Sequence, residues 1–493
     1  MWPFRNFLIP IEMTIKRNLN RYILFTAVIL LCASCKDMIA IPDPINTITT
    51  DKVFENDSQA NSAMTGAYSQ LINEEGALNF GNGLTTSLGS MGADELSLSS
   101  SSPNPYYSNK IPTEDYTTRA LWVGAYSNVY NANAIIEGIS ASTSAKLHTE
   151  VRIKLTAEAK FLRAYSYFYL VNLFGDVPLA LSADFNKTAK MTRTPKAEVY
   201  AQVIKDLQDA KANLSADFSG SQLGERIRAN KWAATAMLAR VYLYTGDYAN
   251  AAAAATEVID QSALFELRPD LNEVFLKNNK EAIWQLQQSN LISPRGNATP
   301  EGYAFRAFPA VIPGQYYGYR VANELVQVFE NQDQRKSSWL MPVAIAGTTT
   351  YYVNKYKIGL GNSAVNAPIT EYYTMLRLAE QYLIRAEAIT LGNQQLDPAI
   401  KDLNVIRARA GVTELPMGLS KAAVVLAIEK ERRTEFFLEW GHRWLDLKRT
   451  GKAHDELSVI SVKQPWAGDY QLLYPIPVSE IQSNNNLTQN PGY

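Results

Sequence analysis

Cysteine and histidine are scarce in this chain of 493 residues, which holds two cysteines and three histidines. A zinc site or a cysteine–histidine nucleophile pair needs clusters of these side chains, so neither is predicted. An excess charge is missing as well, since 47 lysine and arginine residues face 48 acidic ones, and nothing draws the protein to nucleic acid. The sequence also lacks a phosphate-binding P-loop, a Gly-x-Ser-x-Gly elbow and an HExxH motif, and we expect no cofactor.

Long hydrophobic runs are absent too, with one short exception near the start. Tyr22 to Leu31 is an apolar run that follows a basic stretch from Lys16 to Arg21. The run is too short for a membrane span, which needs ~20 apolar residues. It does suit a secretory signal, with Met13 as a candidate start.

The apolar run ends in Cys32-Ala33-Ser34-Cys35, which resembles the bacterial lipobox. Cys35 follows the small residue Ser34 and fits the lipidated position, whereas Cys32 follows Leu31 and does not. We therefore expect a lipoprotein signal peptide over 1–34, a lipidated Cys35 and a tether over 35–50. Several acyl chains at ~0.8 kcal/mol per buried methylene would hold the protein on a membrane. The alternative is a soluble exported protein whose two cysteines are incidental.

The chain as a whole has an ordinary globular composition, 46% hydrophobic and 19% charged, and its patterns after residue 50 are mostly helical. Residues 231–259 predict two close-packed antiparallel helices, which resemble a tetratricopeptide repeat unit. Further helices are expected over 151–171, 376–391, 398–410 and 421–440, and strands over 281–286 and 351–356. The predicted fold is mostly α: a tetratricopeptide-like helical-repeat scaffold over 51–270, a loop-rich middle with few short strands over 271–370, and a helical region and tail over 371–493.

Four segments, taken in order, resemble the SusD/RagB family of surface glycan-binding lipoproteins. They are Ala157–Leu179 (AEAKFLRAYSYFYLVNLFGDVPL), Arg377–Ala388 joined to Leu403–Gly411, Glu429–Arg449 (EKERRTEFFLEWGHRWLDLKR), and Tyr474–Pro477 with Gln489–Tyr493. The family pattern often has Glu and Gly adjacent before the Arg-Trp pair, whereas here Trp440 separates Glu439 from Gly441. With the lipobox, the resemblance covers almost the whole chain.

The resemblance implies a nutrient-uptake function at the cell outer membrane, facing the cell exterior. Family members sit over a SusC-like TonB-dependent transporter, bind oligosaccharides, or peptides in some branches, and pass them to the barrel. On this reading the protein is a binding protein and not an enzyme. Two other classes stay open: a peptide- or protein-binding RagB-type cap or tetratricopeptide-like scaffold, and a surface glycosidase.

A dense charged cluster within 429–449 bears on the glycosidase alternative, because two carboxylates could form an acid/base pair. Glu429/Arg433 and Arg432/Glu435 are opposite charges at helical spacing, so we interpret the cluster as a structural ion-pair network. Asp94 and Glu95 are a second pair of carboxylates, adjacent to each other in the sequence, and we assign them a structural or loop role as well.

Aromatic residues divide by context into core and surface candidates. Most lie in periodic helical stretches and are expected in the core, but two groups lie in loops rich in Pro, Gly, Ser and Asn. A sugar ring needs flat aromatic rings with polar groups beside them. The candidate ligand-binding aromatics are therefore Tyr106, Tyr107, Tyr303, Tyr316, Tyr317 and Tyr319, and the candidate polar contacts are Asn104, Asn109, Gln315 and Arg320. The alternative for any one ring is that it packs its own loop onto the helices.

Overall fold

The computed structural model describes residues 50–73, 78–98, 104–221, 223–306, 318–345, 347–392 and 395–493. The chain divides into two units, 1–53 and 54–493, and in the first of them the short helix α2 (Thr50–Val53) is described. The predicted signal peptide, Cys35 and nearly all of the tether lie outside the described residues. Every helix within the described ranges is too short or too polar to cross a membrane.

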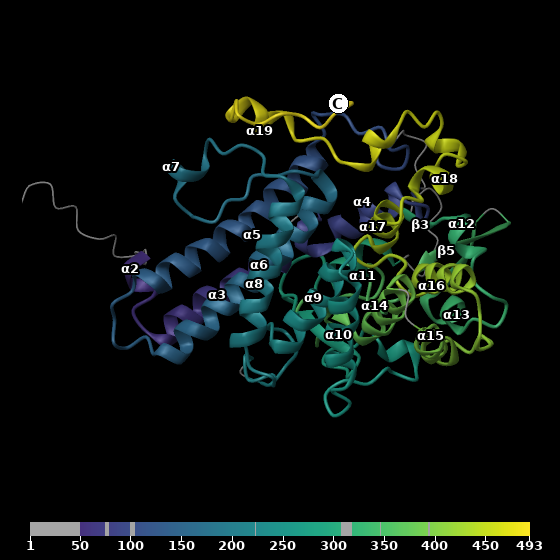
Figure 1. The fold of residues 1–493 in the computed structure, drawn as a ribbon, viewed down its shortest axis with the longest axis horizontal. Coiled ribbons are helices and arrows are strands. Elements are labelled where there is room, and N and C mark those ends of the chain that lie inside the picture. The colour runs from purple at the N-terminus through teal and green to yellow at the C-terminus, as the bar shows by residue number, and fades with distance from the viewer. Residues whose placement is uncertain are drawn as a thin grey trace, which may run out of the picture. The chain divides into compact units, whose positions relative to one another are not determined.

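The second unit is built from helices that pack against one another in series (Figure 1). In its first half α5 packs on α3 and α6, and α6 packs on α8. Their bounds are α3 (Asp57–Asn73), α5 (Tyr116–Ala141), α6 (Thr149–Phe174) and α8 (Lys196–Asn213). The helix predicted over 151–171 is thus α6, which buries a continuous run of aromatic and aliphatic side chains from Phe161 to Phe174.

The predicted tetratricopeptide-like pair is present as α9 (Lys231–Thr245) and α10 (Tyr248–Ile259). Gly246 ends α9 with a φ of 78°, a left-handed conformation that glycine adopts without steric cost. Asp247 then caps α10 by accepting a hydrogen bond from the Asn250 amide. Alanines such as Ala251 and Ala255 pack against Ile384 of α14 (Leu378–Leu391), and their small size lets the three backbones approach closely. The mostly helical, repeat-like fold class is confirmed.

The second half continues the series with helices α14, α15 and α16, which share one hydrophobic cluster. Their bounds, with the following helix, are α14 (Leu378–Leu391), α15 (Asp397–Arg409), α16 (Lys421–Glu435) and α17 (His442–Arg449). The prediction of one helix over 421–440 was wrong at its end. The amides of Leu438 and Trp440 bond to Glu95 and Thr86 instead, and both residues have positive φ.

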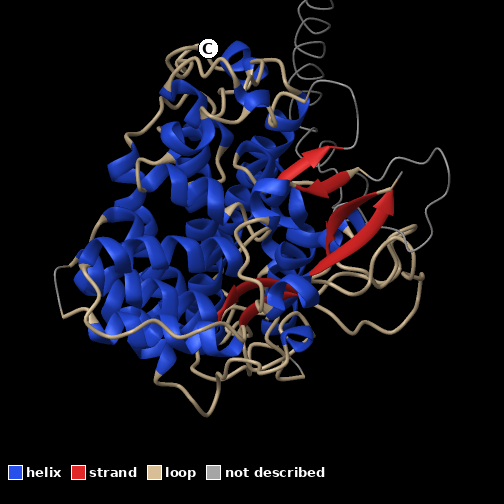
Figure 2. Cartoon of the chain, turned by 90° about the vertical axis from the view of Figure 1, so that its right-hand side faces the viewer, coloured by secondary structure: helices blue, strands red, loops and turns tan. Residues whose placement is uncertain are grey.

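Within the described ranges the strands form three two-stranded antiparallel sheets, which lie among and beside the helices (Figure 2). They pair β1 (Leu96–Leu98) with β3 (Tyr319–Val321), β2 (Ala282–Leu286) with β6 (Tyr373–Arg377), and β4 (Leu340–Ile345) with β5 (Thr348–Val353). The strand predicted over 281–286 is β2, and the one over 351–356 overlaps the end of β5. Leu376 and Arg377, predicted as helix, belong to β6 because they pair with Trp284 and Ala282.

Short helices and a C-terminal segment complete the unit. The helices are α4 (Thr85–Gly92), α7 (Phe185–Thr188), α11 (Pro300–Phe305), α12 (Asn323–Val326), α13 (Gln334–Trp339), α18 (Ala453–Leu457) and α19 (Val478–Ser483), with the helical turns η1 (Phe80–Leu84), η2 (Leu271–Glu273), η3 (Ser461–Lys463) and η4 (Asp469–Leu472). The C-terminal segment returns to the end of α6, where the Tyr474 amide donates to the Leu173 carbonyl and the Asn490 side chain to that of Phe174. The terminal motifs therefore fix the end of the chain to the first half.

Candidate functional site

The short β1–β3 ribbon holds two of the residues that the sequence singled out, Tyr319 and Arg320. Leu96 pairs with Val321 and Leu98 with Tyr319, although more than 200 residues separate them in the chain. The ribbon therefore fixes Tyr319 and Arg320 beside β1, the strand that precedes the other loop group in the chain.

Tyr106 corrects the expectation of an exposed stacking ring. It is only 3% exposed, and its ring packs edge-on against Tyr474 at 5.6 Å between centroids. Its hydroxyl donates to the Asp115 carboxylate and is hydrogen-bonded to Thr118, and burial strongly raises its pKa. A ring that is 3% exposed and held at its hydroxyl has no surface left for a sugar, so Tyr106 belongs to the core.

The two asparagines of the first group shape the backbone of their loop. Asn104 accepts hydrogen bonds from the amides of Tyr106 and Tyr107, an Asx-type turn. Asn109 is 3% exposed, has a φ of 56°, and donates from its side chain to the Gly92 carbonyl. The buried Asn109 amide is thus engaged inside the protein, and the Asn104 side-chain oxygen is engaged within its own loop. Tyr107 is half-buried and keeps part of its ring open.

The described residues of the second group are better placed to contact a ligand. Tyr319 is half-buried, packs edge-on against Phe305 at 5.0 Å, and burial raises its pKa despite a hydrogen bond with Ser87. Its neighbour Arg320 is half-buried, and its Nε has no hydrogen-bond partner among the described residues. Tyr303 lies half-buried on α11. Gln315, Tyr316 and Tyr317 lie outside the described residues.

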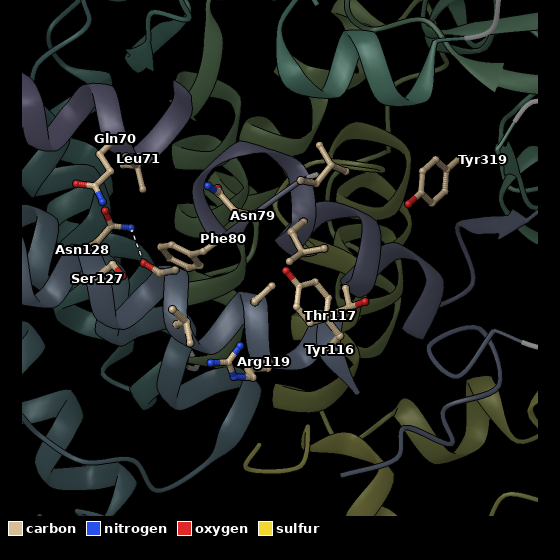
Figure 3. A pocket seen from close by; sticks show the side chains of 15 residues that line it. Gln70, Leu71, Asn79, Phe80, Tyr116, Thr117, Arg119, Ser127, Asn128 and Tyr319 are labelled. Atoms are coloured by element: carbon tan, nitrogen blue, oxygen red, sulfur yellow. Dashed lines mark hydrogen bonds between the residues drawn. The ribbon is translucent and has the colours of Figure 1, made fainter. Parts of the chain in front are cut away.

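Tyr319 opens onto a cavity of ≈ 420 Å³, which we call the α5 cavity. Its walls are the first half of α5, the end of α3 and the turn η1. Figure 3 shows Gln70 and Asn128 at one end, Tyr319 at the opposite end and Tyr116 between them. Tyr116 is 73% exposed, so its ring face is available to a ligand.

A glycine lets the walls of the α5 cavity come together. A Cβ at Gly124 of α5 would lie 3.2 Å from the Phe80 Cβ, which is tighter than an ordinary contact. Phe80 is the buried first residue of η1, and Asn79 caps this turn by accepting a hydrogen bond from the Gly81 amide. The polar rim holds Arg119, whose Nε donates to Ser479 of the C-terminal segment at 3.1 Å.

Sequence reasoning missed Tyr116 although its signal was present. Trp122, Tyr126 and Val129 fall on one face of this helix by their spacing, and Tyr116 lies away from that face. Trp122 and Val129 are buried in the structure, whereas Tyr116 is exposed. An exposed aromatic residue opposite a buried helix stripe is the signal that could have found it.

The charged cluster is an ion-pair network, with partners that differ from those predicted at helical spacing. Glu429 pairs with Lys452 and Arg433 with Asp94, at 2.6 Å in each case. Arg432 bonds Asp446 at 2.7 Å. These partners come from other elements because α16 packs its charged face inward. There, ion pairs with residues distant in the sequence form in place of pairs within the helix.

Glu435 is the centre of this network, and none of its carboxylate oxygens is left for acid/base chemistry. It bonds Arg377 at 2.5 Å and Arg335 at 3.0 Å, and it also pairs with Arg409. These guanidinium groups hold the pKa of Glu435 far below its usual range in spite of its burial. A general acid needs a raised pKa, so this carboxylate is structural.

Comparisons with known proteins agree with the fold and cover most of the chain. Residues 46–243 match a family described as starch-binding and associating with the outer membrane, and residues 314–493 match the SusD family. SusD-like protein P2 of Formosa agariphila is 28% identical, over 96% of this chain and 99% of its own length. Starch-binding protein SusD of Bacteroides thetaiotaomicron is 26% identical, over 69% of this chain and 73% of its own.

Solved structures show the same architecture. A SusD superfamily protein from Bacteroides vulgatus superposes with a TM-score of 0.75 at 21% identity, covering 89% of this chain and 100% of its own. A laminarin-binding SusD-like protein superposes with a TM-score of 0.73 at 25% identity, covering 89% and 100%. At 21% identity, the likeness to the Bacteroides vulgatus protein shows a shared fold alone.

Proposed function

Since the chain belongs to the SusD/RagB family, we propose that it is a cell-surface lipoprotein that captures oligosaccharides and passes them to a SusC-like TonB-dependent transporter for nutrient uptake. Two neighbours support carbohydrate as the ligand, since one is a starch-binding protein and the other binds laminarin. The matched family description supports the outer membrane as the location. The predicted lipobox at Cys35 supplies the anchor.

The α5 cavity is the observation that carries the proposal of a glycan site. It combines two rings, Tyr116 and Tyr319, with amides and hydroxyls such as Gln70, Ser127 and Asn128. A sugar presents an apolar C–H face to a ring and a rim of hydroxyls to polar groups, and the cavity offers partners for both. Tyr107, Tyr303 and Arg320, all half-buried, are further candidate contacts near the β1–β3 ribbon, and Gln315, Tyr316 and Tyr317 remain predicted ones.

The pKa values of the carboxylates in the charged cluster within 429–449 favour binding without cleavage. Glycoside hydrolysis uses two carboxyl groups, one with a raised pKa to act as the acid. Glu435 and Asp446 instead have their pKa values lowered by neighbouring arginines, chiefly Arg409 and Arg377 for Glu435 and Arg432 for Asp446. We therefore propose a binding protein and no enzyme.

The test is calorimetric titration of the purified protein with a panel of oligosaccharides, including laminarin fragments. Tyr116→Ala and Tyr319→Ala should each weaken binding by about 1–3 kcal/mol, the usual contribution of an anchoring ring. That corresponds to roughly 5- to 150-fold in affinity. Tyr130→Ala is the matched control, because Tyr130 is 57% exposed on the same helix but does not line the α5 cavity.

Thermal melts should show that all three variants are folded. If the protein binds no glycan of the panel, the proposed function is wrong. If it binds glycan and both Tyr116→Ala and Tyr319→Ala keep full affinity, the function stands but the site lies elsewhere.

A further inference from the structure

A second and larger cavity lies beside α3, with a volume of ≈ 850 Å³, and we call it the α3 groove. One wall is the exposed side of α3, from Ser58 to Asn73. The other wall is formed by the segment 219–228, before α9, and by residues 286–289 at the end of β2. None of the residues that the sequence singled out for ligand binding lies here.

The α3 wall of the groove carries a row of hydroxyl groups. Its members follow a 4-3-4 spacing that places them on one helix face: Ser58, Ser62, Thr65 and Ser69. At ~1.5 Å per residue the row is roughly 16 Å long. The hydroxyls of Ser62 and Thr65 donate to carbonyls one turn back, so their oxygen lone pairs remain to accept hydrogen bonds.

The opposite wall holds a buried acceptor without a partner. Gln288 is only 1% exposed, and its Nε2 donates to the carbonyls of Asn297 and Glu371, which fixes the orientation of the side-chain amide. Its Oε1 has no hydrogen-bond partner among the described residues. A buried acceptor of this kind calls for a donor, and a ligand hydroxyl in the groove can supply one.

The charges of the groove are largely spent within the protein. Arg228 pairs with the buried Glu158 at 2.8 Å, and Glu225 accepts hydrogen bonds from Tyr372 and Asn278. The rest of its polar lining is mostly neutral hydroxyl and amide groups. A chain of hydroxyls matches such a surface better than a strongly charged ligand, whose counter-charges would be missing.

The α3 groove and the α5 cavity flank the last turns of α3 on different faces of the helix. Ser69 lines the groove, and the next residue, Gln70, lines the cavity. A polymer that fills the cavity therefore has to extend only across this helix to reach the groove. Two sites on one continuous chain reinforce each other, because the second contact is then intramolecular.

We propose that the α3 groove is a second glycan site, which takes a further stretch of the same polysaccharide that enters the α5 cavity. This inference rests on the proposed function, since it assumes a glycan ligand. It assigns the added role of discriminating long chains from short ones to Ser62, Thr65 and Gln288.

The experiment compares polymers with their own trisaccharides, using laminarin, pullulan and xylan as probes. Hydrogen exchange of the wild-type protein should show that a bound polymer protects both residues 57–73 and the first half of α5. The double variant Ser62→Leu/Thr65→Leu should weaken polymer binding in affinity electrophoresis by about tenfold or more. Protection of α5 by the trisaccharide should stay unchanged in this variant.

Lys401→Leu/Ala408→Leu on α15 is the matched control, because both residues are exposed on a helix remote from either cavity. If polymer protects α5 but not residues 57–73, or if the double variant binds polymer like the wild type, the inference is wrong and the proposed function stands. Protection of the groove by a peptide library and by no polysaccharide overturns the inference as well. If no probe binds anywhere, the proposed function fails and the inference fails with it.

Discussion

Two buried glutamates show how strongly the surroundings of a residue decide its charge. Glu435 is surrounded by Arg335, Arg377 and Arg409 and is held ionised. Glu301, equally buried on α11, accepts a hydrogen bond from the Tyr373 hydroxyl at 2.7 Å, and burial raises its pKa to about 8. Paired guanidinium groups offset desolvation in the first case, and a neutral donor does not in the second.

Glu301 should make the stability of the protein depend on pH. Its folded pKa of about 8 lies above its ordinary value of 4.5, so the folded state binds more protons between these two values. The free energy of unfolding should therefore fall as pH rises from about 4.5 to about 8, by ~1.4 kcal/mol per unit of pKa shift. Glu301→Gln removes this titration.

Urea unfolding of the wild type and Glu301→Gln at pH 5 and pH 9 measures the effect. Relative to the wild type, the variant should be more stable at pH 9 than at pH 5. Glu95, whose burial raises its pKa to about 7, titrates in both proteins and cancels in the difference. A difference that is the same at both pH values would contradict the assignment of a raised pKa to Glu301.

Individual residues also show how far the sequence alone predicts burial. Aromatic residues in periodic stretches are expected in the core, and Trp284, Trp444 and Phe168 are fully buried, because periodicity locates an inward face. Tyr106 was misassigned because a loop rich in Ser, Pro and Asn predicts exposure. Its burial depends on Asp115 and Tyr474, and no local pattern announces a partner 368 residues away.

Between elements, glycines mark where two backbones come close. Gly89 lies in α4, and a Cβ there would meet the Gly441 Cα, at the start of α17, at 2.8 Å. Gly66 lies in α3, and nothing lies within 4 Å of a Cβ built there. Both glycines lie inside helices, so replacing each by alanine changes helix propensity in the same way. The difference between the two variants then reports the packing around each Cβ.

Gly66→Ala should stabilise the protein by about 0.5–1 kcal/mol, because alanine restricts the unfolded chain more than glycine does. Gly89→Ala should destabilise it by roughly 1–3 kcal/mol, because the backbone of Gly441 has to move. Chemical denaturation of both variants gives the two signs. A stabilising Gly89→Ala would mean that α4 and α17 are not in the close contact described.

The ends of elements depend on the same long-range contacts. The sequence pattern located α9, α10 and α15 to within a few residues, since Gly246 and the apolar periodicity are local signals. It extended α16 to Trp440, where the structure ends it at Glu435. The amides of Leu438 and Trp440 donate to the side chains of Glu95 and Thr86. These acceptors lie more than 300 positions away in the sequence, so helical periodicity cannot predict them.

At the scale of the molecule, distant segments jointly build the candidate site. The α5 cavity takes its walls from α3, η1 and α5 and its far end from Tyr319, and the C-terminal segment contacts its rim through Ser479. Sequence reasoning predicted that two loop groups share one site, which stays a prediction, and Tyr319 of the second group lines the cavity. It could not predict the cavity itself, because a cavity is a property of packed surfaces.

The proposed lipid anchor would keep such a site at the membrane, and this proposal rests on a single side chain. Cys35 follows Ser34 at the end of the apolar run, and acylation there would tether residues 54–493 through a short segment containing prolines. Several acyl chains hold a protein on a membrane far more firmly than the apolar run alone would after cleavage. Cys35→Ala should therefore abolish metabolic labelling with palmitate and release the protein from the membrane fraction. Cys32→Ala is the control and should leave both unchanged, because Leu31 before it does not fit the lipobox. Labelling that persists in Cys35→Ala would place the anchor elsewhere, and a glycan site without that anchor could no longer be kept beside a transporter.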